Sequence, residues 1–319
     1  MNCAPIALFT YCRADHTRAA VESLLRNQEA AESDLYIFSD GPKNESKELA
    51  VIENREYIRS LKTANDNVNE NEKRLFKSIT IVEREKNWGL ANSLIAGITE
   101  IVNKYGRVIV VEDDLILSPY FLKFMNEALE MYKDDDRVSA ISAFLNPIDC
   151  QAPNTFFLRY FACWGWATWK RGWDLMNLNT KDLLKNIRWK TREFNVGGYG
   201  GFYGMLYCQK IGLVDSWAVR FYASSFLANK LVLFPGKSMA IQTGLDGSGT
   251  HSKMGDTVYN SMQLSMNPIL LADIPVEENR AMYQAYSRYY SRGRKKYSVK
   301  GKYYQFKSFV RRLTGIDYK

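Results

Sequence analysis

The residues with the clearest chemical potential are three consecutive acids, Glu112, Asp113 and Asp114. They follow directly on the apolar run 108–111 and precede a second apolar stretch that reaches Pro119. Adjacent carboxylates repel one another, so the triplet needs a counter-ion. Hard divalent cations prefer carboxylate oxygens and keep positions open for phosphate. The triplet therefore predicts a Mn²⁺ or Mg²⁺ site, and the alternative is a solvated loop whose acids cap the following helix.

Polar residues suited to a nucleotide also follow the three earlier apolar runs of the chain. Arg13 comes after the first run and suits a phosphate or a base, and Asp40 comes after the second and suits a ribose hydroxyl or a base N–H. The third run leads to Arg84 and Asn87, just before a predicted helix whose amino end favours anions. The glycine-rich fingerprints of dinucleotide-binding folds and P-loops do not occur in the sequence, which disfavours a dehydrogenase or an ATPase.

The elements that must position these residues alternate between strand and helix through residue 145. Apolar patterning predicts strands at 4–10, 35–39, 78–82, 108–111 and 138–142, and helices at 17–26, within 45–75, from 90 to a stop at Gly106, and at 119–132. The polar stretch 63–73 is predicted to be an exposed loop. Such alternation with short connections predicts an α/β fold with a mostly parallel, doubly wound sheet. Ligands bind beyond the carboxyl ends of strands in such sheets, so the four polar strand ends should converge.

Composition agrees with a globular protein in a reducing compartment. The 319 residues are 46% hydrophobic and 24% charged, which is ordinary for a chain with a sizeable core. The five cysteines are scattered without a CxxC pair, which argues against a zinc site or a disulfide scaffold. The amino terminus has no basic leader, and no run of eighteen apolar residues occurs, so no signal peptide or membrane span is expected.

The positive charge of the chain is concentrated at its carboxyl end. The net charge is +8, yet residues 286–319 alone contain eleven Lys or Arg and one acid, so residues 1–285 are nearly neutral. Apolar side chains recur there at helical spacing: Phe306, Phe309, Val310 and Leu313. This pattern predicts an amphipathic segment that binds an anionic membrane surface, where each basic residue contributes about 1 kcal/mol. Packing against the body and RNA binding are the alternatives, and the near-neutral body gives no reason to expect a nucleic-acid partner.

The order of motifs "TYCRADH … FSDG … NWGL … VIVVEDDLILSPYF" resembles glycosyltransferases of the GT-A fold. It resembles in particular bacterial family-2-like enzymes related to N-acetylglucosaminyltransferase I, in which EDD replaces the usual Asp-x-Asp. The resemblance extends to "YFACWGWATWKRGWD", "VDSWAVRFYASSF" and "PGKSMAIQTGLDGSGTH". It implies a Rossmann-like GT-A domain with a nucleotide-sugar-binding half at 1–145, a loop-rich acceptor-binding half at 146–280, and a basic aromatic amphipathic tail at 281–319.

The resemblance also implies roles for the strand-end residues. Asp114, the last acid of the triplet, is expected to contact the metal, and Glu112 and Asp113 are expected to hold the ribose and the sugar. Asp40 is expected to recognise uracil, with Arg13 close to the same nucleotide.

A carboxylate is needed as the catalytic base. Inverting transfer requires a carboxylate that takes the acceptor's hydroxyl proton, together with a cation on the departing diphosphate. The resemblance suggests Asp215 of "VDSWAVR" for this role. The alternative for Asp215 is an ion pair with Arg220, and Asp174 and Glu193 are the rival bases.

His251 is one of two histidines in the chain and follows the flexible lead "DGSG". It is predicted to be a second ligand for the metal or the diphosphate, on a loop that closes over the phosphates. The alternative is a histidine without a functional role, as expected for His16 at the start of the first helix.

The stretch "CWGWATWKRGWD" contains four tryptophans. Alternation predicts Trp164 and Trp166 on one face of a strand, where they would form a platform for the acceptor sugar together with Trp217. The alternative is a hydrophobic seam between the two halves of the domain.

These observations lead to one expectation and two rivals. The expected protein is a metal-dependent, inverting glycosyltransferase that moves a sugar from a UDP-sugar to a hydroxyl of a glycan or a lipid-linked acceptor. The expected setting is surface polysaccharide or glycolipid synthesis, in the cytoplasm and peripherally on the inner face of the membrane. One rival is a sugar nucleotidyltransferase, which needs a glycine-rich loop after the first strand that "TYCRADH" does not provide. The other is a catalytically silent carbohydrate-binding protein with the same fold.

Overall fold

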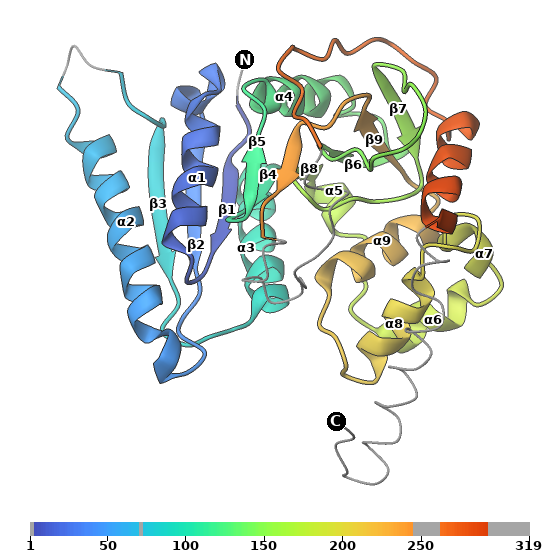
Figure 1. Ribbon diagram of the computed structural model, residues 1–319, viewed down its shortest axis with the longest axis horizontal. Coiled ribbons are helices and arrows are strands. Elements are labelled where there is room, and N and C mark those ends of the chain that lie inside the picture. Colours follow the sequence, from blue (N-terminus) through green and yellow to red (C-terminus); the bar gives the residue numbers. More distant parts are fainter. Residues whose placement is uncertain (1–2, 70–72, 245–261, 293–319) are drawn as a thin grey trace, which may run out of the picture.

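An eight-stranded sheet of mixed direction forms the centre of the protein (Figure 1). The structure is a computed structural model that describes residues 3–69, 73–244 and 262–292. The strand order is β3-β2-β1-β4-β8-β6-β9-β7. The strands are β1 (Ile6–Thr10), β2 (Asp34–Ser39), β3 (Ser78–Glu83), β4 (Arg107–Glu112), β6 (Val138–Ser142), β7 (Thr155–Leu158), β8 (Trp166–Trp169) and β9 (Leu231–Pro235). Strands β3, β2, β1 and β4 are mutually parallel, as are β6 and β9, whereas β8 and β7 run antiparallel to their neighbours.

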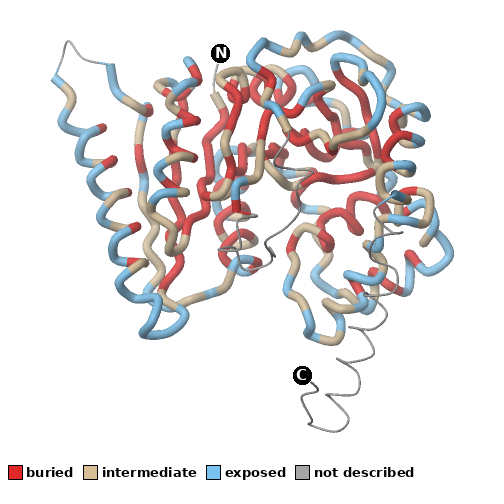
Figure 2. Tube along the Cα trace, viewed as in Figure 1, coloured by how far each residue is buried: buried red, intermediate tan, exposed pale blue. Residues whose placement is uncertain are grey.

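Helices cover both faces of this sheet, because successive strand residues point to opposite sides. Ile6 and Leu8 of β1 belong to one core with α1 (Ala14–Leu25), α2 (Glu48–Asp66) and α4 (Phe121–Met131). Ala7 and Phe9 belong to a second core with α3 (Leu90–Tyr105) and α9 (Trp217–Leu227). Figure 2 shows the central strands buried between these layers, whereas the edge strand β3 is mostly half-buried. The predicted α/β class and the mostly parallel, doubly wound sheet are confirmed.

The predicted strands are all present, whereas two helix boundaries differ from the prediction. Helix α1 starts at Ala14, and α2 continues to Asp66, into the stretch predicted to be a loop. The extension of α2 has a visible cause: the buried Asn65 side chain accepts a hydrogen bond from the backbone N–H of Phe76 at 2.8 Å. The predicted stop at Gly106 is confirmed, since this residue takes the left-handed conformation with φ +76° after the last turn of α3.

The second half of the chain adds strands to the same sheet and then a group of short helices. The remaining elements are η1 (Gln28–Glu32), η2 (Glu45–Lys47), α5 (Lys170–Trp173), α6 (Thr180–Ile187), α7 (Thr191–Phe194) and α8 (Phe202–Lys210). A separate antiparallel pair joins β5 (Leu115–Leu117) to β10 (Ala240–Gln242). In Figure 1, α6 to α9 form a helical lobe at the lower right, beside the sheet. Of the described helices, none is both long enough and apolar enough to cross a bilayer.

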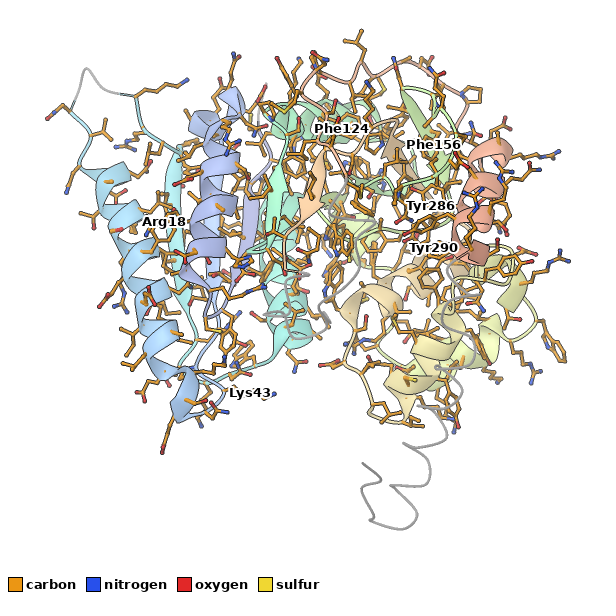
Figure 3. All side chains as sticks on the ribbon, in the orientation of Figure 1. Arg18, Lys43, Phe124, Phe156, Tyr286 and Tyr290 are labelled. Atoms are coloured by element: carbon orange, nitrogen blue, oxygen red, sulfur yellow. The ribbon has the colours of Figure 1, made fainter. Side chains whose placement is uncertain are left out.

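The last described helix, residues 280–292, packs against the body although the sequence predicted a tail from residue 281. Tyr286 is fully buried, and its hydroxyl accepts the Asn146 N–H at 3.4 Å. The Tyr290 hydroxyl donates to that of Tyr160 at 2.8 Å. Figure 3 shows Tyr286 and Tyr290 on this helix. Residues 281–292 therefore pack on the body, and residues 293–319, including the amphipathic repeat, lie outside the described part of the chain.

We expect Tyr286→Ala to reduce the free energy of unfolding by about 3 to 5 kcal/mol, because it leaves a large cavity in the core. Urea unfolding followed by circular dichroism measures this change. Gln284→Ala, on the exposed side of the same helix, is the matched control and should leave the midpoint nearly unchanged. Equal midpoints for both variants would contradict the packing of this helix.

Candidate active site

The acidic triplet lies at the carboxyl end of β4, beside the end of β1. Glu112 is the last residue of β4 and pairs in register with Phe9 of β1. The backbone N–H of Asp113 donates to the Phe9 carbonyl at 3.0 Å, which extends the ladder one residue further. Because β1 to β4 are parallel, the loops after them emerge at one edge of the sheet. The convergence predicted from the sequence is thus present at this edge.

Arg13 is the counter-ion that the fold itself supplies to the triplet. Its Nη2 donates to Asp113 and, at 2.9 Å, to Asp114. Asp113 also accepts the Tyr11 backbone N–H at 3.4 Å. The second guanidinium nitrogen of Arg13, Nη1, is buried and has no hydrogen-bond partner among the described residues. The sequence predicted a metal ion as the counter-ion of the triplet and Arg13 beside the nucleotide. In the structure, Arg13 itself lies among the acids.

Burial shifts two acids of the triplet, Glu112 and Asp113, toward their protonated forms. Burial, reinforced by Asp114 and Asp113, raises the pKa of Glu112 to about 8. Burial also raises the pKa of Asp113 to about 6, although Arg13 opposes the shift. The pKa of the nearby Cys163 thiol is raised by burial and by Glu112. This edge of the sheet is therefore a place where negative charge is costly and an added cation is favoured.

The backbone of Asp114 is held by Thr243, a residue for which the sequence predicted no role. The N–H and the hydroxyl of Thr243 both donate to the Asp114 carbonyl, at 2.8 and 3.0 Å. A Cβ on Gly244 would lie 2.5 Å from Asp114 Oδ2 and 2.9 Å from Arg13 Nη1. Thr243 and Gly244 lie within the stretch "PGKSMAIQTGLDGSGTH" that carries the resemblance, but no role was predicted for either residue. His251 lies outside the described residues.

Asp40 organises the loop between β3 and α3. Its Oδ1 accepts the N–H groups of Gly41 and Trp88 at 3.0 and 2.8 Å, and its Oδ2 accepts that of Gly89 at 2.9 Å. Asn87 donates from its amide to the Gly41 carbonyl at 2.8 Å. Asp40 and Asn87 thus join the ends of β2 and β3, and both oxygens of Asp40 already hold backbone donors.

The Arg84 side chain packs on the exposed ring of Trp88 in this loop. The Arg84 guanidinium lies 3.7 Å from the centroid of the Trp88 ring. Nε and Nη2 of Arg84 are buried without hydrogen-bond partners in the described part of the chain. Trp88 is exposed. The sequence analysis named Arg84 but missed Trp88, for which "NWGL" was the available signal.

Asp215 forms the ion pair that the sequence left as its alternative. Its Oδ1 accepts from Arg220 at 2.9 Å and from Gln209 at 3.3 Å, and its side chain remains 55% exposed. Two residues later, Trp217 stacks on Trp166 at 5.3 Å, and Trp166 pairs in register with Val110 near the end of β4. The start of α9, two residues after Asp215, is thus packed through Trp166 against the carboxyl half of β4.

The two rival bases are held by other ion pairs. Asp174 pairs with Lys170 at 2.7 Å, and the Lys170 N–H donates to the Gly106 carbonyl at the amino end of β4. Asp174 thus belongs to the opposite edge of the sheet from the triplet. Glu193 is exposed and pairs with Arg159 at 3.3 Å.

The prediction that Trp164 and Trp166 share one face of a strand was wrong. Gly165 has φ +69°, and β8 begins only at Trp166, so Trp164 and Trp166 do not alternate along one strand. Trp166 and Trp217 are buried within an aromatic core and offer no face to a sugar ring. They form the hydrophobic seam that was the alternative. Trp164 is half-buried, packs edge-on against Phe144 at 4.4 Å, and touches both cores.

The donor atoms at the end of β4 suit a hard divalent ion. In the part of the chain that the structure describes, three or more His, Cys, Asp or Glu side chains are nowhere grouped to enclose a metal. Asp114 is the more accessible of the two acids bound to Arg13, at 14% exposure against 7% for Asp113. Mg²⁺ sites commonly use one or two carboxylates and complete their shell with water and substrate phosphates. The residues present therefore fit an ion that is shared with a phosphate ligand.

Comparison with known proteins gives a family match and weak similarities to solved structures. The profile of the GNT-I family matches residues 1–181. No curated protein matches the sequence. The S. aureus TarS crystal structure shares 12% identity over 47% of this chain and 23% of the TarS chain, with a TM-score of 0.29. UDP-glucose pyrophosphorylase complexed with UDP-glucose shares 11% identity over 73% of this chain and 90% of its own, with a TM-score of 0.35. The chain thus spans about a quarter of the TarS chain.

We expect Gly244→Ala to lower the free energy of unfolding by about 1 to 3 kcal/mol, because the new Cβ would overlap Asp114 and displace Arg13. Thermal and urea unfolding report this change. Gly204→Ala in α8 is the control, since its Cβ would meet no atom within 4 Å, and it should leave stability equal or slightly higher. A Gly244→Ala protein as stable as the wild type would show that Gly244 does not constrain this site.

Proposed function

The chain belongs to the GNT-I family of glycosyltransferases, and from this premise we propose that it is a metal-dependent, inverting enzyme that uses a UDP-sugar. The observation that carries the proposal is the acidic triplet at the end of β4, with Asp114 fixed by Thr243 and placed beside the loops of β1, β2 and β3. The acceptor is proposed to be a hydroxyl of a glycan or a lipid-linked saccharide in surface polysaccharide or glycolipid synthesis.

In this proposal the strand-end residues bind the donor. Asp114 would hold Mn²⁺ or Mg²⁺, which supplies positive charge to the diphosphate as it departs. Arg13 can turn its unpaired Nη1 toward the same phosphates, and Glu112 and Asp113 are placed to contact the ribose and the sugar. Asp40 and Asn87 shape the base pocket through the loop 84–89, and the Arg84 guanidinium and the Trp88 ring offer a flat surface to the base.

Asp215 is proposed as the base. Arg220 and Gln209 both donate to Oδ1 of Asp215, so Oδ2 has no hydrogen-bond partner among the described residues and can accept a proton. The acceptor oxygen forms a bond to the anomeric carbon while the bond from that carbon to the diphosphate breaks. The hydroxyl proton passes to Asp215, and UDP leaves with the electron pair. Arg220 orients the carboxylate throughout this step. Trp164 is the tryptophan that remains a candidate for contact with the acceptor.

Binding of UDP tests the metal role of the triplet. We expect Asp114→Asn to weaken Mn²⁺-dependent UDP binding at least tenfold, because the variant removes the charge that would hold the ion. Isothermal titration with UDP, with and without Mn²⁺, measures the loss. Asp136→Asn, an exposed acid that pairs with Arg171, is the matched control. Wild-type protein that binds UDP equally with and without Mn²⁺ would argue for a scaffold or a metal-independent enzyme.

Turnover tests the base. We expect Asp215→Asn to keep the UDP affinity of the wild type while UDP release from the preferred donor falls about 10²- to 10⁴-fold, the range typical of a lost general base. A screen of UDP-sugars identifies that donor first. Glu193→Gln and Asp174→Asn are controls and should retain turnover. Full activity in Asp215→Asn would move the base to another residue, and formation of a UDP-sugar from UTP and a sugar 1-phosphate would favour a nucleotidyltransferase.

The basic segment 293–319 is proposed to hold the enzyme on the inner face of the membrane. It contains nine Lys or Arg and one Asp. We expect a protein truncated after Arg292, which keeps the packed helix 280–292, to bind anionic vesicles much more weakly at low salt than the full chain. Co-sedimentation measures the difference. Equal binding by both proteins would exclude the segment as the main attachment.

A further inference from the structure

Helix α8 exposes apolar residues on both flanks of its buried Leu206, at positions where most surface helices are polar. Of its nine residues, FYGMLYCQK, only Leu206 is buried. Met205 is 42% exposed and Tyr207 52% exposed, and Tyr199 and Leu213 on either side of the helix are exposed to a similar extent. We call these four residues the α8 surface. Contiguous exposed apolar residues on a soluble protein commonly mark a contact with a partner or a membrane.

The helical lobe around the α8 surface is strongly cationic. Its exposed basic residues are Lys181, Lys185, Arg188, Lys190, Arg192 and Lys210. The lobe also contains Asp182, Glu193 and Asp215, of which Glu193 pairs with Arg159 and Asp215 with Arg220, so basic residues remain in excess. Trp189, between two of the cations, is among the most exposed aromatic side chains described. Exposed aromatic and apolar side chains among Lys and Arg are typical of surfaces that lie in the interface of an anionic bilayer.

The cationic end of the chain departs from the same lobe. Helix 280–292 lies against the start of α8, where the Tyr290 and Phe202 rings are 5.5 Å apart. The Gly197 N–H donates to the Tyr283 hydroxyl at 3.0 Å, which ties the loop before α8 to that helix. Residues 293–319 continue directly from this point with a net charge of +8. The last described helix, which precedes this basic segment in the sequence, therefore lies against the start of α8.

Charge decides between a bilayer and a second copy of the chain as the occupant. Pairing two copies through this lobe would bring two cationic surfaces together, and like charges at an interface are repulsive. Anionic headgroups instead neutralise the lysines and arginines, while the apolar side chains enter the boundary between headgroups and acyl chains.

We propose that the α8 surface is a membrane-contact site, at which Met205 and Tyr207 insert into the headgroup region of an anionic bilayer. The site is directly linked to Asp215, because Gln209 of α8 donates to the Asp215 carboxylate at 3.3 Å and accepts the Ser216 N–H at 2.6 Å. If Asp215 is the base, as in the proposed function, this contact presents an acceptor embedded in the bilayer to the catalytic carboxylate.

Vesicle binding by the full-length protein tests this site. The probe is a vesicle of phosphatidylcholine and phosphatidylglycerol in about 0.5 M NaCl, where screening over roughly 4 to 5 Å weakens attraction by exposed charges. We expect the double variant Met205→Ser with Tyr207→Ser to bind at least tenfold more weakly than the wild type. Leu49→Ser with Ile52→Ser is the matched control, since these α2 residues are 81% and 44% exposed outside the lobe, and it should bind as the wild type does.

Three results would overturn the proposal. The first is wild-type vesicle binding by the α8 variant when its unfolding midpoint is unchanged. The second is a dimer of the wild type in sedimentation velocity that the α8 variant loses, which would make the surface an interface between copies. The third is a loss of transfer to a water-soluble acceptor, which would make it part of the acceptor site. The vesicle assay contains no donor, so its outcome is independent of whether the enzyme transfers a sugar.

Discussion

The structure depends on the burial of negative charge at the end of β4. Strand β4 lies in the middle of the sheet with both faces covered, so the acids that follow it cannot all be hydrated. The Arg13 guanidinium bridges Asp113 and Asp114 and compensates part of their charge. Burial also raises the pKa of Glu112 to about 8. Removing one partner of such a buried pair leaves an uncompensated charge, which is strongly destabilising. The loops at this edge of the sheet must therefore accommodate the buried charge of these acids.

The same constraint connects the fold to nucleotide-sugar chemistry. In the proposed function, a divalent ion would compete with Arg13 for the same oxygens, and a phosphate ligand that attracts both cations would allow them to share the site. Thr243 fixes Asp114 by its backbone and leaves its carboxylate to the cations. The aromatic core around Trp166 and Trp217 then sets the distance from β4 to the α9 end that carries Asp215. The acidic triplet and Asp215 are thus held by one sheet and the helices packed on it.

Much of this arrangement could be predicted from the sequence, because it follows from periodicity and parallel topology. Apolar runs located the first strands, and parallel direction implies that Arg13, Asp40 and Glu112 meet at one edge. Individual partners could not be predicted, because Arg13 and Asp113 are 100 residues apart and their contact depends on tertiary distances. Trp164 and Trp166 were misplaced because Gly165 adopts φ +69°, which alternation cannot reveal. Thr243 was missed because its N–H and hydroxyl both bind the backbone carbonyl of Asp114, a contact that arises only from the tertiary fold.

The central claim is that Asp114 holds a divalent ion against the diphosphate of a sugar donor. Crystals soaked with Mn²⁺ and UDP, measured at a wavelength where manganese scatters anomalously, test it most directly. The account predicts one strong anomalous peak at roughly 2.0 to 2.2 Å from an Asp114 oxygen and from the phosphates, with Arg13 moved toward UDP. A manganese peak bound by other residues, or UDP bound away from the end of β4 with the Arg13–Asp114 ion pair intact, would contradict it.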